Sequence, residues 1–215
     1  MTKLFDGFIF DIDGTLTSTN QLIFDSFNFI AKKYLNKSFT DDEIISMFGP
    51  PENDILKRLC GENYESARKD YFNYYAENHW KAELYNGIKE ILEHLKSKNY
   101  PVGIFTGKGR DASLITLKKF GVDHYFDLIV TGDDVLNHKP SAEGILKFTS
   151  KFKLKNERVL MIGDSVADIE ASREAGVKIA SVLWDSYACE EVKSMQSDYY
   201  FHTVKELSDF FLKYS

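Results

Sequence analysis

The sequence of 215 residues contains few cysteines and prolines and no long hydrophobic run. No apolar stretch approaches the roughly 18–20 residues of a membrane-spanning helix, so no membrane partner is expected. The segment before Asp6 has no secretory hydrophobic region. The two cysteines, Cys60 and Cys189, lie far apart and outside any CxxC pattern, which predicts two buried free thiols. These absences predict a soluble, cytoplasmic protein.

Positive charge is also scarce. The chain has 27 Lys and Arg against 33 Asp and Glu, a formal net charge of −6. Non-specific nucleic-acid binding depends on clustered positive charge, so no nucleic-acid partner is expected. With 43% hydrophobic and 28% charged residues, the composition is that of a folded protein, and the length fits one domain or a core with a smaller insert.

Short apolar runs alternate with amphipathic helical patterns over most of the chain. The runs have the length and composition of buried strands, and they occupy residues 7–10, 102–105, 128–130, 159–162 and 179–183, with a weaker candidate at 199–201. One of the helical stripes between them is Ile88, Ile91, Leu92 and Leu95. This alternation predicts an α/β fold, a doubly wound parallel sheet covered on both faces.

One long segment, residues 17–81, interrupts this rhythm with helical patterns and no convincing strand. Thr40-Asp41-Asp42-Glu43 has the form of a capping box that opens one of its helices. We therefore predict an inserted α-helical cap domain over residues 17–81, on an α/β core formed by residues 1–16 and 82–215. The alternative is that these helices pack within a single domain.

Polar residues gather where the predicted strands end, and the carboxyl ends of parallel strands form the ligand-binding edge of a sheet. They are Asp11, Asp13, Thr106, Gly107, Lys139, Asp164 and Asp168. Two carboxylates about 4 Å apart repel by roughly 4 kcal/mol at an effective dielectric near 20, so such a cluster requires a cation or protonation. Oxygen-only ligands select a hard ion such as Mg²⁺, which commonly bridges carboxylates to a phosphate. The pattern therefore indicates phosphoryl chemistry.

The same residues suit the parts of a phosphoryl transfer. Asp11 is a candidate nucleophile that forms an aspartyl-phosphate, and Asp13 is a candidate general acid and base. Thr106 with the turn at Gly107 can hold phosphate oxygens, and Lys139 can neutralise the phosphate and the nucleophile. Taken singly, each has a plain alternative, since Asp-Gly-Thr is a common turn and Asp-Ser a common helix cap. Their joint occurrence at successive strand ends favours a catalytic set.

These motifs resemble those of the haloacid dehalogenase superfamily. Residues 8–17, Phe-Ile-Phe-Asp-Ile-Asp-Gly-Thr-Leu-Thr, resemble its first motif in the form found in phosphatases. Thr106-Gly107 is similar to the second motif, Lys139-Pro140 to the third, and residues 163–168 to the fourth. The helical insert is similar to the cap of the subgroup that includes phosphoglycolate phosphatases, β-phosphoglucomutases and pyrophosphatases.

The resemblance implies a role for each matching residue. Asp11 would be the nucleophile and a Mg²⁺ ligand, and Asp13 the general acid and base with its main-chain carbonyl on the metal. Asp164 would be a metal ligand, and Asp168 a ligand or a residue that holds one. Thr106, Gly107 and Lys139 would bind phosphate. The dehalogenases of this superfamily lack the second acid, so Asp13 argues against cleavage of a carbon–halogen bond.

The expected function is a Mg²⁺-dependent phosphatase that acts on a small phosphorylated metabolite through an aspartyl-phosphate, similar to phosphoglycolate phosphatase. A sugar-phosphate mutase similar to β-phosphoglucomutase and a pyrophosphatase are alternatives. A non-enzymatic alternative is a receiver-like signalling domain that accepts a phosphoryl group. Either a monomer or a homodimer is expected.

Substrate selection is expected to come from the cap. Residues 17–21 and the turn at 47–51 are candidates to face the site, with Lys57 and Arg58 as candidate anion contacts. The segment Thr106-Gly107-Lys108-Gly109-Arg110 is unusually basic. It either attracts an anionic substrate or places exposed charges at the start of a helix, and the second reading is the one we favour.

Overall fold

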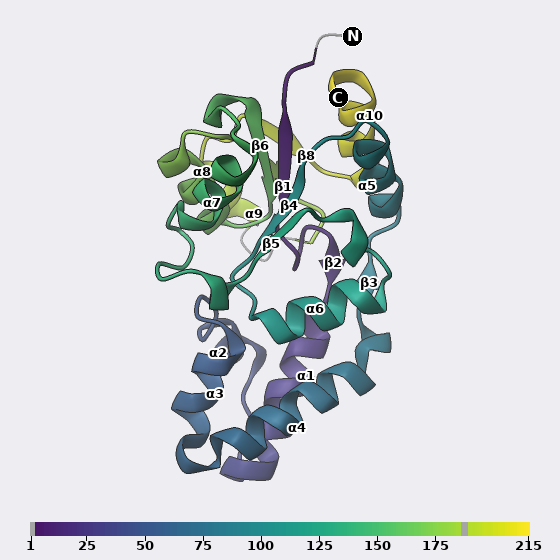
Figure 1. Cartoon of the computed structure of the whole chain (residues 1–215). Coiled ribbons are helices and arrows are strands. Elements are labelled where there is room, and N and C mark those ends of the chain that lie inside the picture. Colours follow the sequence, from purple (N-terminus) through teal and green to yellow (C-terminus); the bar gives the residue numbers. More distant parts are fainter. Residues whose placement is uncertain (1–2, 186–188) are drawn as a thin grey trace.

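The computed structural model, which describes residues 3–185 and 189–215, contains a sheet of six parallel strands (Figure 1). The strands lie in the order β5-β4-β1-β6-β7-β8, and their bounds are β1 Gly7–Phe10, β4 Val102–Phe105, β5 Leu128–Val130, β6 Val159–Gly163, β7 Lys178–Val182 and β8 Tyr199–Phe201. The doubly wound parallel sheet is thus confirmed, including the weaker candidate strand near the end of the chain.

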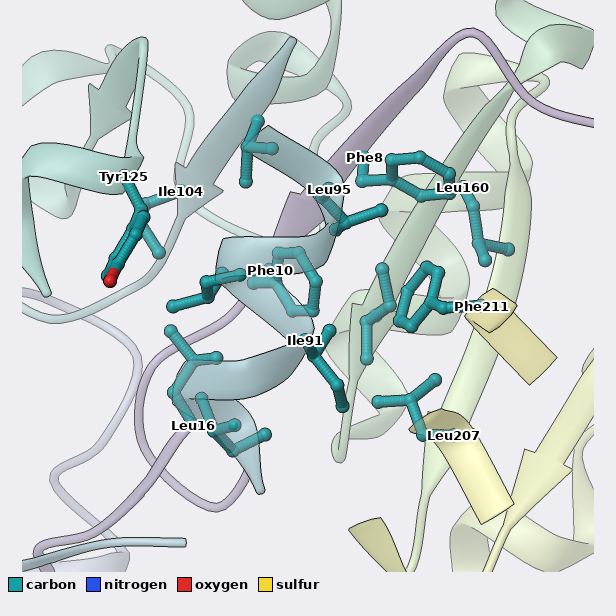
Figure 2. Packing of buried hydrophobic residues seen from close by; sticks show 14 of the residues in the cluster. Phe8, Phe10, Leu16, Ile91, Leu95, Ile104, Tyr125, Leu160, Leu207 and Phe211 are labelled. Atoms are coloured by element: carbon teal, nitrogen blue, oxygen red, sulfur yellow. The ribbon is translucent and has the colours of Figure 1, made fainter. Parts of the chain in front are cut away.

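Helices cover both faces of the sheet because successive side chains of each buried strand point to opposite faces. Phe8 and Phe10 of β1 pack with α5 and α10 on one face, where Figure 2 shows them beside Ile91 and Phe211. Ile9, between them in the sequence, packs on the other face with residues of α7, α8 and α9. The helices of this α/β region are α5 Ile88–Ser97, α6 Arg110–Lys119, α7 Glu143–Phe152, α8 Val166–Ala175, α9 Cys189–Ser194 and α10 Val204–Tyr214.

A separate group of helices lies beyond one end of the sheet (Figure 1). These are α1 Asn20–Ile30, which continues as a π-helical turn over Ala31–Leu35, α2 Asp41–Ile45, α3 Glu52–Cys60 and α4 Tyr64–Glu77. The capping box predicted for Thr40 and Glu43 is present at the start of α2. A buried cluster that includes Phe27, Leu56 and Tyr71 holds the group together and extends to Ala112 of α6.

The expectation of no strand within residues 17–81 was wrong at the start of that segment. Two-residue strands, β2 (Thr17–Ser18) and β3 (Glu83–Leu84), pair antiparallel where the chain leaves the sheet region and returns to it. A two-residue strand is too short to show a hydrophobic period in the sequence. The two strands pair because the segment that leaves the sheet region lies beside the segment that returns to it.

The strand register places the predicted site residues that follow β1, β4 and β6 at the same edge of the sheet. Phe10 pairs with Ile104 of β4 on one side and with Ile162 of β6 on the other. Asp11 follows Phe10, and Thr106 and Asp164 each come two residues after the paired isoleucine. The strand order reverses beside β1, which is where parallel sheets bind ligands.

Two expectations from composition also bear on the fold. Within residues 3–185 and 189–215, no helix has both the length and the apolar character needed to cross a membrane. Both thiols are free, as predicted, although Cys189 is half-buried where the sequence analysis expected a buried side chain.

Candidate active site

A cavity of about 390 Å³ lies between the carboxyl ends of β1, β4 and β6 on one side and α1, α3 and the turn at residues 48–50 on the other. Its lining includes six of the seven residues predicted from the strand ends, namely Asp11, Asp13, Thr106, Gly107, Lys139 and Asp164. The seventh, Asp168, is fully buried and in contact with Lys139. The fold therefore brings all the predicted catalytic residues to one place, as their positions after the strands required.

Asp11 lies at the end of β1, where its carboxylate is held by neighbours on both sides. The Ile12 N–H donates a 2.8 Å hydrogen bond to Asp11 Oδ1, and Lys139 Nζ lies 3.3 Å from the same oxygen. Burial raises the pKa of Asp11 to about 6 even though Lys139 acts to lower it, and the charge of Asp168 adds to the increase. The Asp11 side chain is thus fixed in orientation. Its charged form is also less favourable than that of an exposed aspartate.

Lys139 is positioned by Asp168, which itself caps a helix. Ser165 and Asp168 form a capping box at the start of α8, with the Ser165 hydroxyl donating to Asp168 Oδ2 at 2.7 Å. The other oxygen, Asp168 Oδ1, accepts from Lys139 Nζ at 2.5 Å. Burial alone would lower the pKa of Lys139, but Asp11 and Asp168 raise it above its ordinary value. Lys139 therefore stays cationic beside Asp11.

Three carboxylates form a cluster that suits a hard metal ion. Asp11, Asp164 and Asp168 each offer an oxygen, and these oxygens lie within 4.8 Å of one another. Burial, followed by the charges of Asp11 and Asp168, raises the pKa of Asp164 well above its usual range. An oxygen-only donor set of this charge fits Mg²⁺, because a divalent cation offsets the buried negative charge of these carboxylates and the repulsion between them.

Gly14 makes room for this cluster. It has φ +74°, and a Cβ built there would stand 2.2 Å from Asp164 Oδ2. Both the left-handed backbone and the close approach of Asp164 therefore require glycine at this position of the first motif.

Asp13 is held from the side of the cavity that faces the cap helices. The Thr19 hydroxyl donates a hydrogen bond to Asp13 Oδ1, and Lys108 Nζ lies 3.1 Å from Asp13 Oδ2. Both partners fix the carboxylate two residues beyond the candidate nucleophile Asp11.

Lys108 is buried between the sheet region and the helices, so the expectation of exposed helix-start charge was wrong for this residue. Its ammonium lies 3.8 Å from Glu52 Oε1 at the start of α3 and 5.0 Å from the ring centroid of Tyr75 in α4. Burial alone would lower the pKa of Lys108, but Asp13, Tyr75 and Glu52 raise it above its ordinary value. Arg110, by contrast, is exposed and 3.4 Å from Asp134, as that expectation described.

Glu52 is a residue of the cavity that the sequence analysis missed. The Gly109 N–H donates to Glu52 Oε2 at 2.6 Å, and burial raises the pKa of the carboxyl. The position directly after Gly49-Pro50-Pro51 marks it as the first residue of a helix, but nothing local indicates that it meets Lys108. Only the packing of α3 against the 106–109 loop brings these two residues together.

The candidate anion contacts Lys57 and Arg58 do not face the cavity, which corrects the expectation from sequence. Both are exposed on α3, and Lys57 lies 3.7 Å from Asp54. Ile55 and Leu56 on the opposite side of this helix are buried. Residues 17–21 and 47–51, the two segments expected to face the site, do contribute to the cavity lining. Their lining residues are Asn20, Phe48, Gly49 and Pro50.

The phosphate-loop candidates lie close to the cap helices. Thr106 is buried, and its hydroxyl accepts a 3.3 Å hydrogen bond from the Lys108 N–H. A Cβ on Gly107 would come within 3.6 Å of the Gly49 carbonyl oxygen. The loop that lines the cavity next to Asp11 is therefore in near contact with the turn that precedes α3.

Comparisons with known proteins identify the family to which this chain belongs. Residues 8–182 match the family model described as haloacid dehalogenase-like hydrolase. The pyrophosphatase PpaX of Halalkalibacterium halodurans is 35% identical over 202 residues, 94% of each chain. A predicted phosphoglycolate phosphatase from Haemophilus somnus has a TM-score of 0.85 at 24% identity, covering 98% of this chain and 99% of the other.

A third comparison extends the likeness of fold. The structure of CbbY from Rhodobacter sphaeroides in complex with phosphate has a TM-score of 0.81 at 18% identity and covers 94% of this chain and 96% of the other. The family model spans the four motifs and the helical insert between the first two, so the resemblance is confirmed over most of the chain. This protein therefore belongs to the haloacid dehalogenase-like hydrolases and is an enzyme of that family.

Proposed function

We propose that the protein is a Mg²⁺-dependent phosphatase that acts on a small phosphorylated metabolite through an aspartyl-phosphate on Asp11. The observation that carries this proposal is the position of the Asp11 carboxylate. It lines the cavity beside Lys139, belongs to the acid cluster and lies next to the Thr106-Gly107 loop. A nucleophile, its counter-charge and a phosphate-binding loop thus share one small volume.

The reaction follows from two carboxylates with different surroundings. An oxygen of Asp11 attacks phosphorus, the bond from phosphorus to the alcohol oxygen breaks, and Asp13 delivers a proton to the leaving alkoxide. In the second half, Asp13 takes a proton from a water molecule that attacks phosphorus, and Asp11 leaves with inorganic phosphate released. Thr19 and Lys108 hold Asp13 for both transfers.

Lys139 and the metal ion would neutralise different negative charges in the site. Asp11 and Asp168 raise the pKa of Lys139 and so keep it protonated. The cationic Lys139 neutralises phosphate oxygens as they approach Asp11. Asp11, Asp164 and Asp168, with the main-chain carbonyl of Asp13, would hold Mg²⁺, which when bound offsets their charge and polarises a phosphate oxygen. Thr106 and Gly107 would bind the remaining phosphate oxygens.

Residues 17–81 would form the cap domain, with residues 1–16 and 82–215 as the core. Closed over the cavity, the cap excludes water other than the attacking molecule, which protects the aspartyl-phosphate from the wrong acceptor. A buried cluster made mostly by these helices, which also includes Ala82 and Ala112 of the core, supports this division.

Pyrophosphate hydrolysis is a second candidate function. Relatives named pyrophosphatase PpaX, such as that of Halalkalibacterium halodurans, share 30–35% identity with more than nine-tenths of this chain. A receiver-like signalling function is not supported, because the family match extends over the cap insert, which a receiver lacks.

Phosphate release from a panel of phosphorylated metabolites tests the proposal. The panel should include sugar phosphates, phosphoglycolate, nucleotides and pyrophosphate, each assayed with Mg²⁺ and with excess chelator. The proposal expects release that depends on the metal. Release that is unchanged by chelator would contradict the metal requirement, and no release from any substrate by the folded protein would contradict the phosphatase.

A further inference from the structure

We propose that the cavity selects phosphate esters whose leaving group is an uncharged alcohol, and that Glu52 is the residue that excludes a second anionic group. This inference rests on the proposed phosphatase function and narrows its substrate class. It follows from the charges and apolar side chains on the cap side of the cavity.

The leaving group has only one direction in which to extend. The phosphoryl group must sit against Asp11, with Lys139 and the 106–107 loop around it. The sheet closes the cavity behind these residues, because β1 is fully buried. The rest of the substrate therefore extends toward α1, the turn at residues 48–50, and α3, which form the other wall of the cavity.

That wall offers a second anion no free positive charge. Among the described residues, Glu52 is the one charged side chain that the cap region contributes to the lining. Lys57 and Arg58, the nearest cations on α3, are exposed on the outside of the helix. A carboxylate or a second phosphate on the leaving group would approach Glu52 without a cap cation to bind it.

Of the described residues of the core that line the cavity, Lys108 is the one cation on this side, and its charge is already offset. Its ammonium is 3.1 Å from Asp13 Oδ2 and 3.8 Å from Glu52 Oε1, so one positive charge faces two carboxyl groups. Glu52 is in turn fixed by the Gly109 N–H. An anionic leaving group would have to draw Lys108 away from both partners and would leave Glu52 buried with no cation near it, which is unfavourable.

The remaining side chains of the wall suit a small, largely apolar alcohol. Ile23 and Phe27 of α1, Phe48 of the turn and Ile55 of α3 contribute apolar surface, and Asn20 contributes one amide. Such a wall binds carbon atoms by burial and can hydrogen-bond a hydroxyl group through Asn20. Simple alkyl phosphates, with or without one further hydroxyl group, have this character, whereas pyrophosphate and phosphoglycolate do not.

The test compares two esters of equal size that differ in charge. 2-Hydroxyethyl phosphate and phosphoglycolate differ by one CH₂OH group in place of a carboxylate, and pyrophosphate is assayed beside them. We expect kcat/KM to favour 2-hydroxyethyl phosphate by about tenfold or more. In Glu52→Gln, which keeps an acceptor for Gly109, this preference should fall by about tenfold, the effect expected of one charge at short range inside a protein.

The matched control is Glu62→Gln, which removes an exposed glutamate from the same group of helices and should leave the ratio unchanged. A wild-type preference for phosphoglycolate or pyrophosphate would overturn the inference even if Glu52→Gln did not fold. An unchanged ratio in a folded Glu52→Gln variant would also overturn it. Absence of hydrolysis of every ester and of pyrophosphate would instead contradict the phosphatase function itself, so the two failures are distinguishable.

Discussion

The Lys108 ammonium lies 3.1 Å from the Asp13 carboxylate although 95 positions separate the two residues in the sequence. Glu52 approaches the same ammonium from α3, so the candidate acid-base group, a residue of the 106–109 loop and a residue of α3 share one network. The contact of α3 with the sheet region is therefore stabilised by charge as well as by apolar packing.

Removing Lys108 should destabilise the protein mainly through Glu52. In Lys108→Met the Glu52 carboxyl stays buried without its cation, and we expect a loss of about 3 kcal/mol in the free energy of unfolding. The double variant Lys108→Met/Glu52→Gln should recover most of this loss, because no unpaired charge is left at Glu52. Urea unfolding of the wild type, both single variants and the double variant measures the coupling. Additive effects of the two substitutions would show that the pair is not coupled.

Gly14 and Gly121 provide a matched pair for the metal site. Both have positive φ, so alanine at either position should cost about 1 kcal/mol in backbone strain. Only at Gly14 would the new Cβ meet Asp164, whereas no heavy atom lies within 4 Å of the corresponding position at Gly121. We expect Gly14→Ala to lose Mg²⁺-dependent activity and the Mg²⁺-induced rise in melting temperature.

Gly121→Ala should keep both properties at slightly lower stability. Thermal unfolding with and without Mg²⁺ measures this difference. Equal Mg²⁺ responses in the two variants would place the metal away from Asp164.

Stabilisation by Mg²⁺ should depend on pH. Because burial raises the pKa of Asp11 from 3.8 to about 6, the folded protein holds this proton at pH 5 more strongly than the unfolded chain does. As the pH rises through about 6 the proton is lost and carboxylate repulsion destabilises the metal-free protein. Added Mg²⁺ should therefore raise the melting temperature more at pH 7.5 than at pH 5. A larger rise at pH 5 would contradict the site.

Much of the fold and of the candidate site was predictable because both depend on local signals. Strands of a parallel sheet are buried on both faces, so they read as short apolar runs, as Val102–Phe105 and Val159–Gly163 do. The residues that follow such strands must share one edge. Asp11, Thr106 and Asp164 could therefore be placed together from the sequence alone.

The cap side of the site was less predictable because tertiary packing decides it. Glu52 meets Lys108 only through the docking of α3 on the 106–109 loop, and no short-range pattern encodes that contact. The error at Lys57 and Arg58 was avoidable. Ile55 and Leu56 mark the buried side of α3, and the two basic residues that follow them turn toward solvent.

Phosphate release by Asp11→Asn tests the central claim most directly. Asparagine keeps the size of the side chain and lacks the nucleophilic oxygen, so the variant should fold with wild-type circular dichroism. It should release phosphate at least a thousandfold more slowly, roughly the loss expected when a nucleophile is removed. The assay uses the best substrate of the panel with saturating Mg²⁺. A folded Asp11→Asn protein with turnover near that of the wild type would show that Asp11 is not the nucleophile.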